Sequence, residues 1–206
     1  MPDIHDSLPL PADLQIDTLV DVGVAEGTPW LYDRFPDARL VLIDPMEIPP
    51  ELAERLAHRV PAIHEIAVGA KKGGATLYVD LERTSRTSLY ERTALTNTGN
   101  PIEQSVTAIR RLDDIVGDPG YGMLGIKIDT EGHELEVLKG AEGVLERCAF
   151  ILCEVSIAER FAGSYRQEEL IGWLAEHGFG KADVLRTVEG RGGQALFSDM
   201  LFRPER

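Results

Sequence analysis

Short, near-continuous apolar runs, separated by glycine turns and segments of helical periodicity, recur along the chain. The apolar runs are residues 18–24, 39–44, 63–68, 123–128 and 149–155. Continuous runs of this length, rich in valine, isoleucine and leucine, are typical of parallel strands that are buried on both faces. The intervening segments place apolar residues at helical spacing, as in residues 51–59 and 131–145. This alternation predicts an α/β protein whose parallel sheet is covered by helices on both sides.

The pattern changes in the middle of the chain and again at its end. A Lys-Lys-Gly-Gly turn leads into residues 76–79, whose alternating polarity predicts an antiparallel or edge strand. Residues 83–104 are polar, and a loop of this length inside a domain is often a lid over a site. In the tail, residues 182–188 and 195–203 predict an antiparallel pair that closes one edge of the sheet.

Chain length and composition favour one domain. With 206 residues, the chain is long enough for one well-packed domain and short for two. Residues 1–17 carry Pro2, Pro9 and Pro11 and are expected to form an extended arm. We therefore expect an N-terminal arm over 1–17 and a single domain over 18–206.

Charge and cysteine content restrict the partners and the compartment. The formal net charge is −14, which disfavours duplex nucleic acid and anionic membranes as partners. The sequence has neither a basic, apolar leader nor a run of about 20 apolar residues. Cys148 and Cys153 are five positions apart in one expected strand, which would place them unbonded on opposite faces. The expected location is the cytoplasm.

Residues 125–134 gather several ionisable side chains where a strand passes into a helix. The pattern predicts that Thr130 caps a helix whose first residue is Glu131. Asp129, Glu131 and His133 would then lie at the open edge of the sheet, where α/β proteins bind ligands.

A glycine turn follows the first strand, with Asp21, Gly23 and Gly27 in order. It differs from the dinucleotide pattern because it has no middle glycine. Asp44, at the end of the second strand, is placed to accept hydrogen bonds from a ribose diol. Together these features favour an adenosine-bearing cofactor, and the acid Asp21 favours a cationic or amino-acid-like portion on it.

Several motifs resemble the FkbM family of S-adenosylmethionine-dependent methyltransferases. They are Asp21-Val22-Gly23 through Gly27, Ile43-Asp44-Pro45, residues 66–69, 111–114, 126–134 and 138–141. The resemblance covers residues 18–155 and is most specific in its second half. It implies a class I methyltransferase (Rossmann-like) three-layer sandwich. That fold has a mostly parallel seven-stranded sheet with an antiparallel C-terminal strand, here with an extra hairpin or edge strand. It also implies O-methylation of a hydroxyl on a sugar or natural product.

The same resemblance implies a set of cofactor contacts. Asp21, Gly23 and Gly27 would surround the methionine portion, and Asp44 would bind the ribose hydroxyls. Ala67 and Val68 would lie near the adenine. The chain departs from the family between the two glycines, where residues 24–26 lack the frequent Ala-Asn pair.

Proton removal from the acceptor hydroxyl needs a base, for which His133, Asp129 and Glu131 are the candidates. Histidine titrates nearest neutral pH and is the first choice, with Asp129 orienting it or the substrate. The structural alternatives are a surface position for His133 and favourable charge at a helix N-terminus for Glu131 and Glu134. Lys127, between two isoleucines, is expected to be a buried partner of an acid.

Other readings of the same residues stay open. Asp129, Glu131 and Glu154 could hold a divalent metal, but no ligand spacing is diagnostic, so S-adenosylmethionine is the predicted cofactor. Arg86 and Ser88, in the polar loop, are candidate contacts to a small-molecule or glycosyl acceptor. The rival functions are a nucleoside-cofactor-binding protein without turnover and, less favoured, an NAD-dependent oxidoreductase. The oligomeric state is left open.

Overall fold

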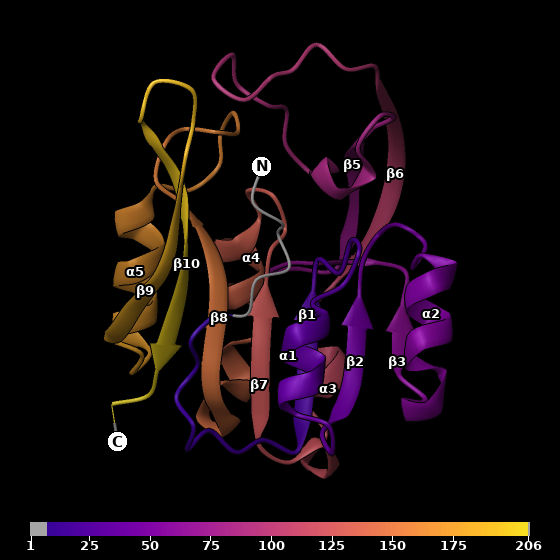
Figure 1. The fold of residues 1–206 in the computed structure, drawn as a ribbon, viewed down its shortest axis with the longest axis vertical. Helices are drawn as coiled ribbons and strands as arrows, with labels where there is room; N and C mark the ends of the chain where they lie inside the picture. Colours follow the sequence, from indigo (N-terminus) through magenta and orange to yellow (C-terminus); the bar gives the residue numbers. More distant parts are fainter. Residues whose placement is uncertain (1–7, 206) are drawn as a thin grey trace.

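A seven-stranded sheet forms the centre of the computed structural model, which describes residues 8–205 (Figure 1). Its strands are β1 (Thr18–Val22), β2 (Arg39–Ile43), β3 (Ala62–His64), β7 (Leu124–Ile128), β8 (Cys148–Ser156), β9 (Lys181–Glu189) and β10 (Ala195–Arg203). Their order is β3-β2-β1-β7-β8-β10-β9. Neighbours from β3 to β8 pair in parallel, and the C-terminal strand β10 is antiparallel to both β8 and β9. The predicted class I methyltransferase fold is confirmed.

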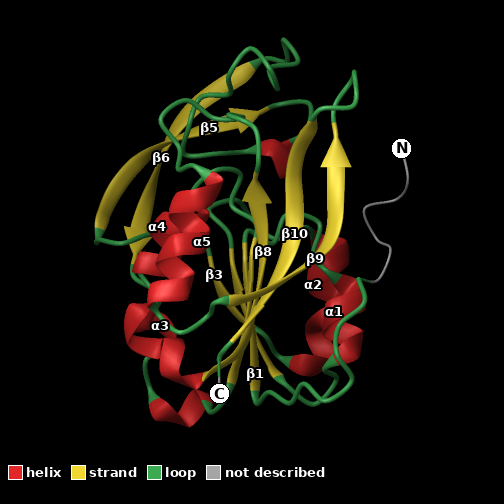
Figure 2. Cartoon of the chain, turned by 90° about the vertical axis from the view of Figure 1, so that its left-hand side faces the viewer, coloured by secondary structure: helices red, strands yellow, loops and turns green. Residues whose placement is uncertain are grey.

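Helices cover both faces of this sheet, which makes three layers (Figure 2). The helices are α1 (Pro29–Arg34), α2 (Pro50–Leu56), α3 (Asp113–Val116), α4 (Glu134–Lys139) and α5 (Gln167–Glu176), with 3-10 turns η1 (Ala57–Arg59), η2 (Thr84–Arg86), η3 (Pro119–Tyr121) and η4 (Glu142–Arg147). Helices α1 and α2 lie on one face, and α3, α4 and α5 lie on the other. Successive side chains of a strand point to opposite faces, so Leu19 packs into one core while Val20 and Val22 pack into the other. In residues 8–205, we find no helix with the length and apolarity to cross a membrane.

The expected strand over 63–68 is wrong as a single strand. Residues 62–64 form β3 beside β2, whereas β4 (Ala67–Val68) leaves that sheet and pairs with β6 (Ile102–Arg110). With β5 (Gly73–Asp80), these strands form a separate three-stranded sheet of order β4-β6-β5. The expected edge strand near residues 76–79 therefore extends this small sheet and not the large one. In Figure 1 the β5–β6 pair rises above the carboxyl ends of the parallel strands.

The expected helix start at Glu131 is also wrong, because α4 begins at Glu134. Glu131 has φ +52° and Gly132 has φ +104°, which right-handed helices do not accommodate. In place of a Thr130 cap, the buried Glu134 carboxylate accepts hydrogen bonds from the backbone N–H groups of Thr130 (2.9 Å) and Gly132 (3.0 Å). The chain therefore makes a tight turn before the helix, and this turn carries the candidate chemistry.

Both cysteines are free and buried, but they do not lie on opposite faces as expected. Cys148 and Cys153 belong to the same core cluster. The register between β7 and β8 shifts between Cys148 and Phe150, so one extra residue interrupts the alternation of side chains.

Part of the expected N-terminal arm, residues 1–7, lies outside the described residues. Residues 8–17 form neither helix nor strand, and they place Leu14 and Ile16 against the core on the α1 side. Arg34 of α1 donates hydrogen bonds to the carbonyl oxygens of Pro11 (3.3 Å) and Ala12 (2.9 Å).

Gly125 offers a test of this packing. A Cβ at this position in β7 would lie 2.5 Å from Cζ of the buried Phe150 ring, which stacks on Phe35. We expect Gly125→Ala to lower the free energy of unfolding by about 1–3 kcal/mol through overpacking. Urea denaturation measures the effect. The matched control is Gly172→Ala in α5, where the added methyl meets open space and should raise stability by about 0.5–1 kcal/mol. Equal effects of the two substitutions would contradict the packing described.

Candidate active site

A cavity opens at the carboxyl ends of β1 and β7. These neighbouring strands lie where the strand order reverses, the usual binding crevice of an open α/β sheet. The predicted site residues that line it are Gly23, Asp44, Ala67, Val68, Ser88, Asp129, Glu131 and His133. Asp21, Gly27 and Arg86 are not among its lining residues. The structure therefore brings most of the predicted site residues together around one space.

Gly23 allows the loops after β1 and β7 to touch. Its φ is +79°, and a Cβ there would lie 1.8 Å from the carbonyl oxygen of Asp129. Its N–H donates to the carbonyl oxygen of Ile43 (2.9 Å) at the end of β2. No other residue type fits this position, because the added carbon would force the two loops apart. Gly27 also has a positive φ, +86°, and packs against the methyl groups of Leu52.

Asp44 fixes the glycine turn and faces the cavity. One carboxylate oxygen accepts from the N–H of Ala25 (3.0 Å) and the other from the N–H of Met46 (2.8 Å). Burial raises the pKa of this carboxyl, and the two backbone hydrogen bonds work in the opposite direction. Each carboxylate oxygen has two acceptor sites, so both oxygens keep one for a bound diol.

Asp21 is fully buried beneath the glycine turn. Its carboxylate accepts from the hydroxyls of Tyr32 (2.5 Å) and Thr28 (3.2 Å) and lies 3.1 Å from the ammonium of Lys127. Lys127 also donates to the carbonyl oxygen of Gly23 (2.6 Å) and lies 3.6 Å from a carboxylate oxygen of Asp129. Burial opposes the charge on Lys127, but Asp21 and Asp129 outweigh it and raise its pKa. The expectation that Lys127 is a buried partner of an acid is confirmed.

The turn from Asp129 to His133 is held by contacts from four directions. Besides the Glu134 carboxylate, Ser88 donates to the carbonyl oxygen of Glu131 (2.6 Å), and Ser164 donates to that of Gly132 (2.6 Å). The Phe161 ring packs so closely that a Cβ at Gly132 would lie 2.7 Å from it. The backbone of the Asp129–His133 turn is therefore fixed by protein contacts, independently of any ligand.

His133 turns both ring nitrogens towards the protein. Nδ1 lies 3.2 Å from the hydroxyl of Tyr90. Nε2 is buried beside Gly69 and has no hydrogen-bond partner within residues 8–205. Burial lowers the pKa of His133 from 6.5 to about 4. The imidazole is therefore neutral at pH 7, and protonating it is costly.

Asp129 is the most open of the acids at the site. Its side chain is 39% exposed, against 16% for Glu131, and it lines the cavity. Among the candidates, it presents a carboxylate that an acceptor molecule can reach.

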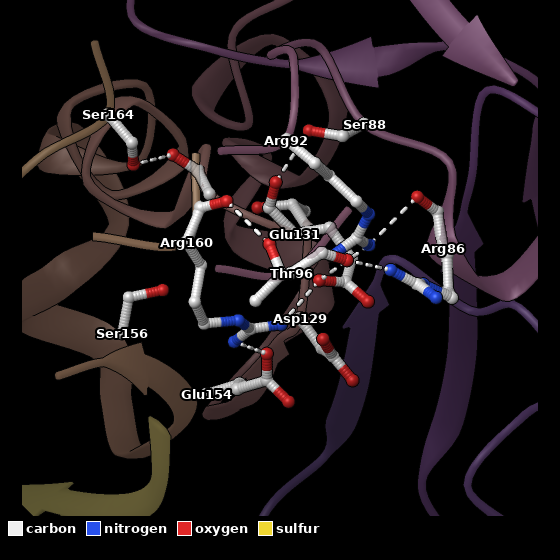
Figure 3. Close-up of polar contacts among 12 residues, drawn as sticks. Arg86, Ser88, Arg92, Thr96, Asp129, Glu131, Glu154, Ser156, Arg160 and Ser164 are labelled. Carbon is white, nitrogen blue, oxygen red and sulfur yellow. Dashed lines mark hydrogen bonds and ion pairs between the residues drawn. The ribbon is translucent and has the colours of Figure 1, made fainter. Parts of the chain in front are cut away.

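Glu131 is held by two arginines (Figure 3). Its Oε2 lies 2.6 Å from Arg160 and 3.2 Å from Arg92, and Arg160 also contacts Oε1 of Glu154 at 2.5 Å. The Arg160 side chain thus lies between the carboxylates of Glu131 and Glu154, which the sequence offered as metal ligands. No group of three or more His, Cys, Asp or Glu side chains in the described part of the chain is placed to hold a metal ion.

Residues 83–101, referred to below as the roof, pass over the cavity. Five roof residues line the cavity: Thr84, Ser85, Thr87, Ser88 and Leu89. The other predicted substrate residue, Arg86, is used within the roof, where it donates to the carbonyl oxygen of Thr96 (2.6 Å) and to the hydroxyl of Thr98 (3.2 Å).

Sequence reasoning missed Tyr90, Arg92 and Arg160. None of them stands in a motif, and each reaches the site only through the folding of the roof and of the segment after β8. Glu134 was noted only as a helix charge, although its spacing after Thr130 and Gly132 allows it to accept from both of their N–H groups.

The lowered pKa of His133 predicts a pH dependence of stability. Between pH 6.5 and about 4, the imidazole of His133 is protonated in the unfolded protein but neutral in the folded protein. The free energy of unfolding should therefore fall as the pH drops through this window. One pKa unit corresponds to about 1.4 kcal/mol, so the loss from this group should approach about 3 kcal/mol. Urea denaturation, repeated at about half-unit steps from about pH 7.5 to about pH 4.5, measures the free energy of unfolding of the protein and of His133→Gln. We expect this free energy to depend less steeply on pH in the variant. The exposed His58, changed to Gln, is the control. Parallel curves for the protein and His133→Gln would disprove the assignment.

Several solved structures are similar to this chain at low sequence identity. The 1,6-didemethyltoxoflavin-N1-methyltransferase of Burkholderia thailandensis, with S-adenosylhomocysteine bound, is 13% identical with a TM-score of 0.46, and the match covers 92% of this chain and 71% of that one. Magnesium protoporphyrin IX methyltransferase of Synechocystis PCC 6803, with S-adenosylmethionine bound, is 11% identical with a TM-score of 0.44, covering 93% and 72%. The mitomycin 7-O-methyltransferase MmcR is 17% identical with a TM-score of 0.33, covering 91% and 49%.

No curated protein matches the sequence. The family comparison is decisive, because the model of the methyltransferase FkbM domain matches residues 21–180, which include the glycine turn, Asp44, the Asp129–His133 turn and α5. The chain therefore belongs to the FkbM family of S-adenosylmethionine-dependent methyltransferases.

Proposed function

We propose that this protein transfers a methyl group from S-adenosylmethionine to a hydroxyl of a sugar or natural-product acceptor, and that Asp129 takes up the hydroxyl proton. The proposal rests on the partly exposed Asp129 carboxylate, which lines a cavity between the glycine turn and a hydroxyl-rich roof.

The residues at the glycine turn fit the cofactor. Gly23 lines the cavity and lets the loops after β1 and β7 meet there, and Asp44 has free acceptor sites for the ribose diol. Ala67 and Val68 give the cavity an apolar wall for the adenine. Asp21 and Gly27 act from outside the cavity, Asp21 through Lys127 and Gly27 through the shape of the turn. When bound, S-adenosylmethionine supplies the methyl group on a cationic sulfonium, for which the acids around the cavity provide a favourable field.

Asp129 is better placed than His133 to receive the proton. A general base must come within hydrogen-bond reach of the proton that it takes. Both nitrogens of His133 face protein groups, and its burial disfavours the protonated form. We therefore propose that His133 and Tyr90 form a wall of the cavity, and that Glu131 fixes the turn through its two arginines.

The roof supports a hydroxyl-bearing acceptor. Thr84, Ser85, Thr87 and Ser88 line the cavity, and the buried Thr87 hydroxyl has no hydrogen-bond partner among residues 8–205. Hydroxyl side chains can both donate to and accept from the hydroxyls of a polyhydroxylated molecule, and buried polar atoms such as Thr87 Oγ1 are usually hydrogen-bonded. In this proposal Ser88 lies beside the bound acceptor and fixes the Glu131 carbonyl oxygen, and Arg86 holds the roof in place.

Replacing Asp44 tests the cofactor site. Asp44→Ala should weaken binding of S-adenosylmethionine by about 1–3 kcal/mol, or about 5- to 150-fold in dissociation constant, because it removes the acceptors for the ribose hydroxyls. Isothermal titration calorimetry measures the constant. The exposed Asp37, changed to Ala, removes the same charge far from the cavity and should leave binding unchanged. An unaltered constant in Asp44→Ala would remove Asp44 from the ribose site.

Replacing Asp129 tests the proton acceptor. Asp129→Asn keeps the size of the side chain and should lower kcat by about 10²- to 10⁴-fold while cofactor binding persists. Transfer of labelled methyl groups from S-adenosylmethionine to a panel of sugars and phenolic natural products provides the assay. His133→Gln should lower kcat much less, and the reverse ranking would exchange the two roles. Cofactor binding without transfer to any acceptor would instead favour a binding protein without turnover.

A further inference from the structure

Arg160 connects the Asp129–His133 turn to the roof, although it does not itself line the cavity. Its side chain is only 5% exposed and reaches both Glu131 and Glu154 (Figure 3). Burial opposes its charge, but the Glu154 and Glu131 carboxylates outweigh this effect and raise its pKa. The guanidinium also lies over the rings of Phe161 (5.0 Å) and Phe197 (4.4 Å).

The four-residue cluster Arg92, Glu131, Glu154 and Arg160 joins two buried arginines to two carboxyl groups, and burial and the nearby Asp129 raise the pKa of Glu154. Removing one member from such a buried group leaves an uncompensated charge, which is strongly unfavourable. The cluster is therefore expected to act as a unit, so the loss of either arginine should release Glu131.

Glu131 transmits this constraint to the backbone. It adopts φ +52°, a left-handed conformation that is unfavourable for a residue with a side chain, and its neighbour Gly132 is left-handed as well. The arginines hold the side chain while Ser88 holds the carbonyl oxygen. Asp129 lies two residues earlier in the same turn, so its position depends on this conformation.

The main chain of Arg160 holds the roof. Its carbonyl oxygen accepts from the N–H of Thr93 (3.0 Å) and the hydroxyl of Thr96 (2.8 Å). Arg92, itself a roof residue, binds Glu131 and donates to the carbonyl oxygen of Arg86 (3.0 Å). Arg160 thus contacts both the Asp129–His133 turn, through its side chain, and the roof, through its main chain.

We propose that Arg160 is a positioning residue for methyl transfer. It acts through Glu131 to hold the Asp129 turn and, with Arg92, keeps the roof seated on that turn. The catalytic part of this inference rests on the proposed function, whereas the structural part does not.

The test compares Arg160→Met with Arg203→Met. Arg203 makes an ion pair of similar length, but more exposed, with Asp183 of the edge strand β9 (2.7 Å). Hydrogen exchange, followed by mass spectrometry without any ligand, should be about tenfold or more faster in residues 129–133 and 90–97 of Arg160→Met, and unchanged there in the control. Unchanged exchange in both segments would overturn the structural part, whether or not the protein transfers methyl groups.

Kinetics then test the catalytic part. Arg160→Met should lower kcat by about 10- to 100-fold, because a small displacement of Asp129 is costly, while the dissociation constant of S-adenosylmethionine changes by less than about threefold. Arg160→Lys should keep part of the activity, because it retains the charge but loses the two-sided contact. Guanidinium chloride at about 10 mM, well below denaturing concentrations, should partly restore Arg160→Ala, whereas equal sodium chloride should not.

Two further variants cover the case in which Arg160→Met does not fold. Arg92→Met and Glu131→Gln break the same cluster from its other members, and the double variant Arg92→Met/Glu131→Gln should lose less than the sum of the single losses. Full kcat in these folded variants, with an active parent protein, would overturn the positioning role. Absence of cofactor binding in the parent protein would instead refute the proposed function, with the exchange experiment still deciding the structural part.

Discussion

The buried ammonium of Lys127 lies where the two halves of the sheet meet, and it contacts both halves of the site. It pairs with Asp21 from β1, donates to the backbone of Gly23 in the glycine turn, and lies near Asp129 in the turn after β7. A buried Asp21 without this cation would be very costly. With it, the loops that carry the cofactor contacts and the candidate base have a fixed relative position. The close approach of Gly23 to the Asp129 carbonyl is the steric counterpart of this electrostatic contact.

The site keeps several unfavourable features that the surrounding structure holds in place. Ala25 and Glu131 are left-handed without being glycine, and His133 and Glu134 each leave a buried polar atom without a hydrogen-bond partner within the described residues. Such features persist where neighbouring contacts over-determine the conformation, and they cluster at functional sites. Here those contacts come from Asp44, which accepts from the N–H of Ala25, and from Ser88, Ser164 and the two arginines around the second turn.

Burial divides the ionisable groups of the site into different kinds. The charges of Lys127 and Arg160 are kept by neighbouring carboxylates, although both are buried. For His133, burial outweighs the favourable field of the Glu136 carboxylate and keeps the imidazole neutral. Of the two candidate bases that bring a carboxylate to the cavity, Asp129 is more exposed than Glu131, whose carboxylate is paired with two arginines. A sequence motif that names Asp129, Glu131 and His133 together does not separate these three roles, because the roles depend on what each side chain meets.

The sequence alone determined the parts of the protein that depend on local pattern. Continuous apolar runs predicted the parallel strands, and the glycine turn with Asp44 predicted the cofactor side, because a buried strand and a tight turn each restrict the residues that form them. The tertiary structure decided what depends on distant partners. β4 leaves the large sheet because β6 pairs with it, and α4 starts late because Glu134 and the roof hold a left-handed turn before it. Arg160 meets Glu131 across 29 residues of sequence, and no local pattern records such a contact, since it arises only when the roof and the segment after β8 fold over the strand ends.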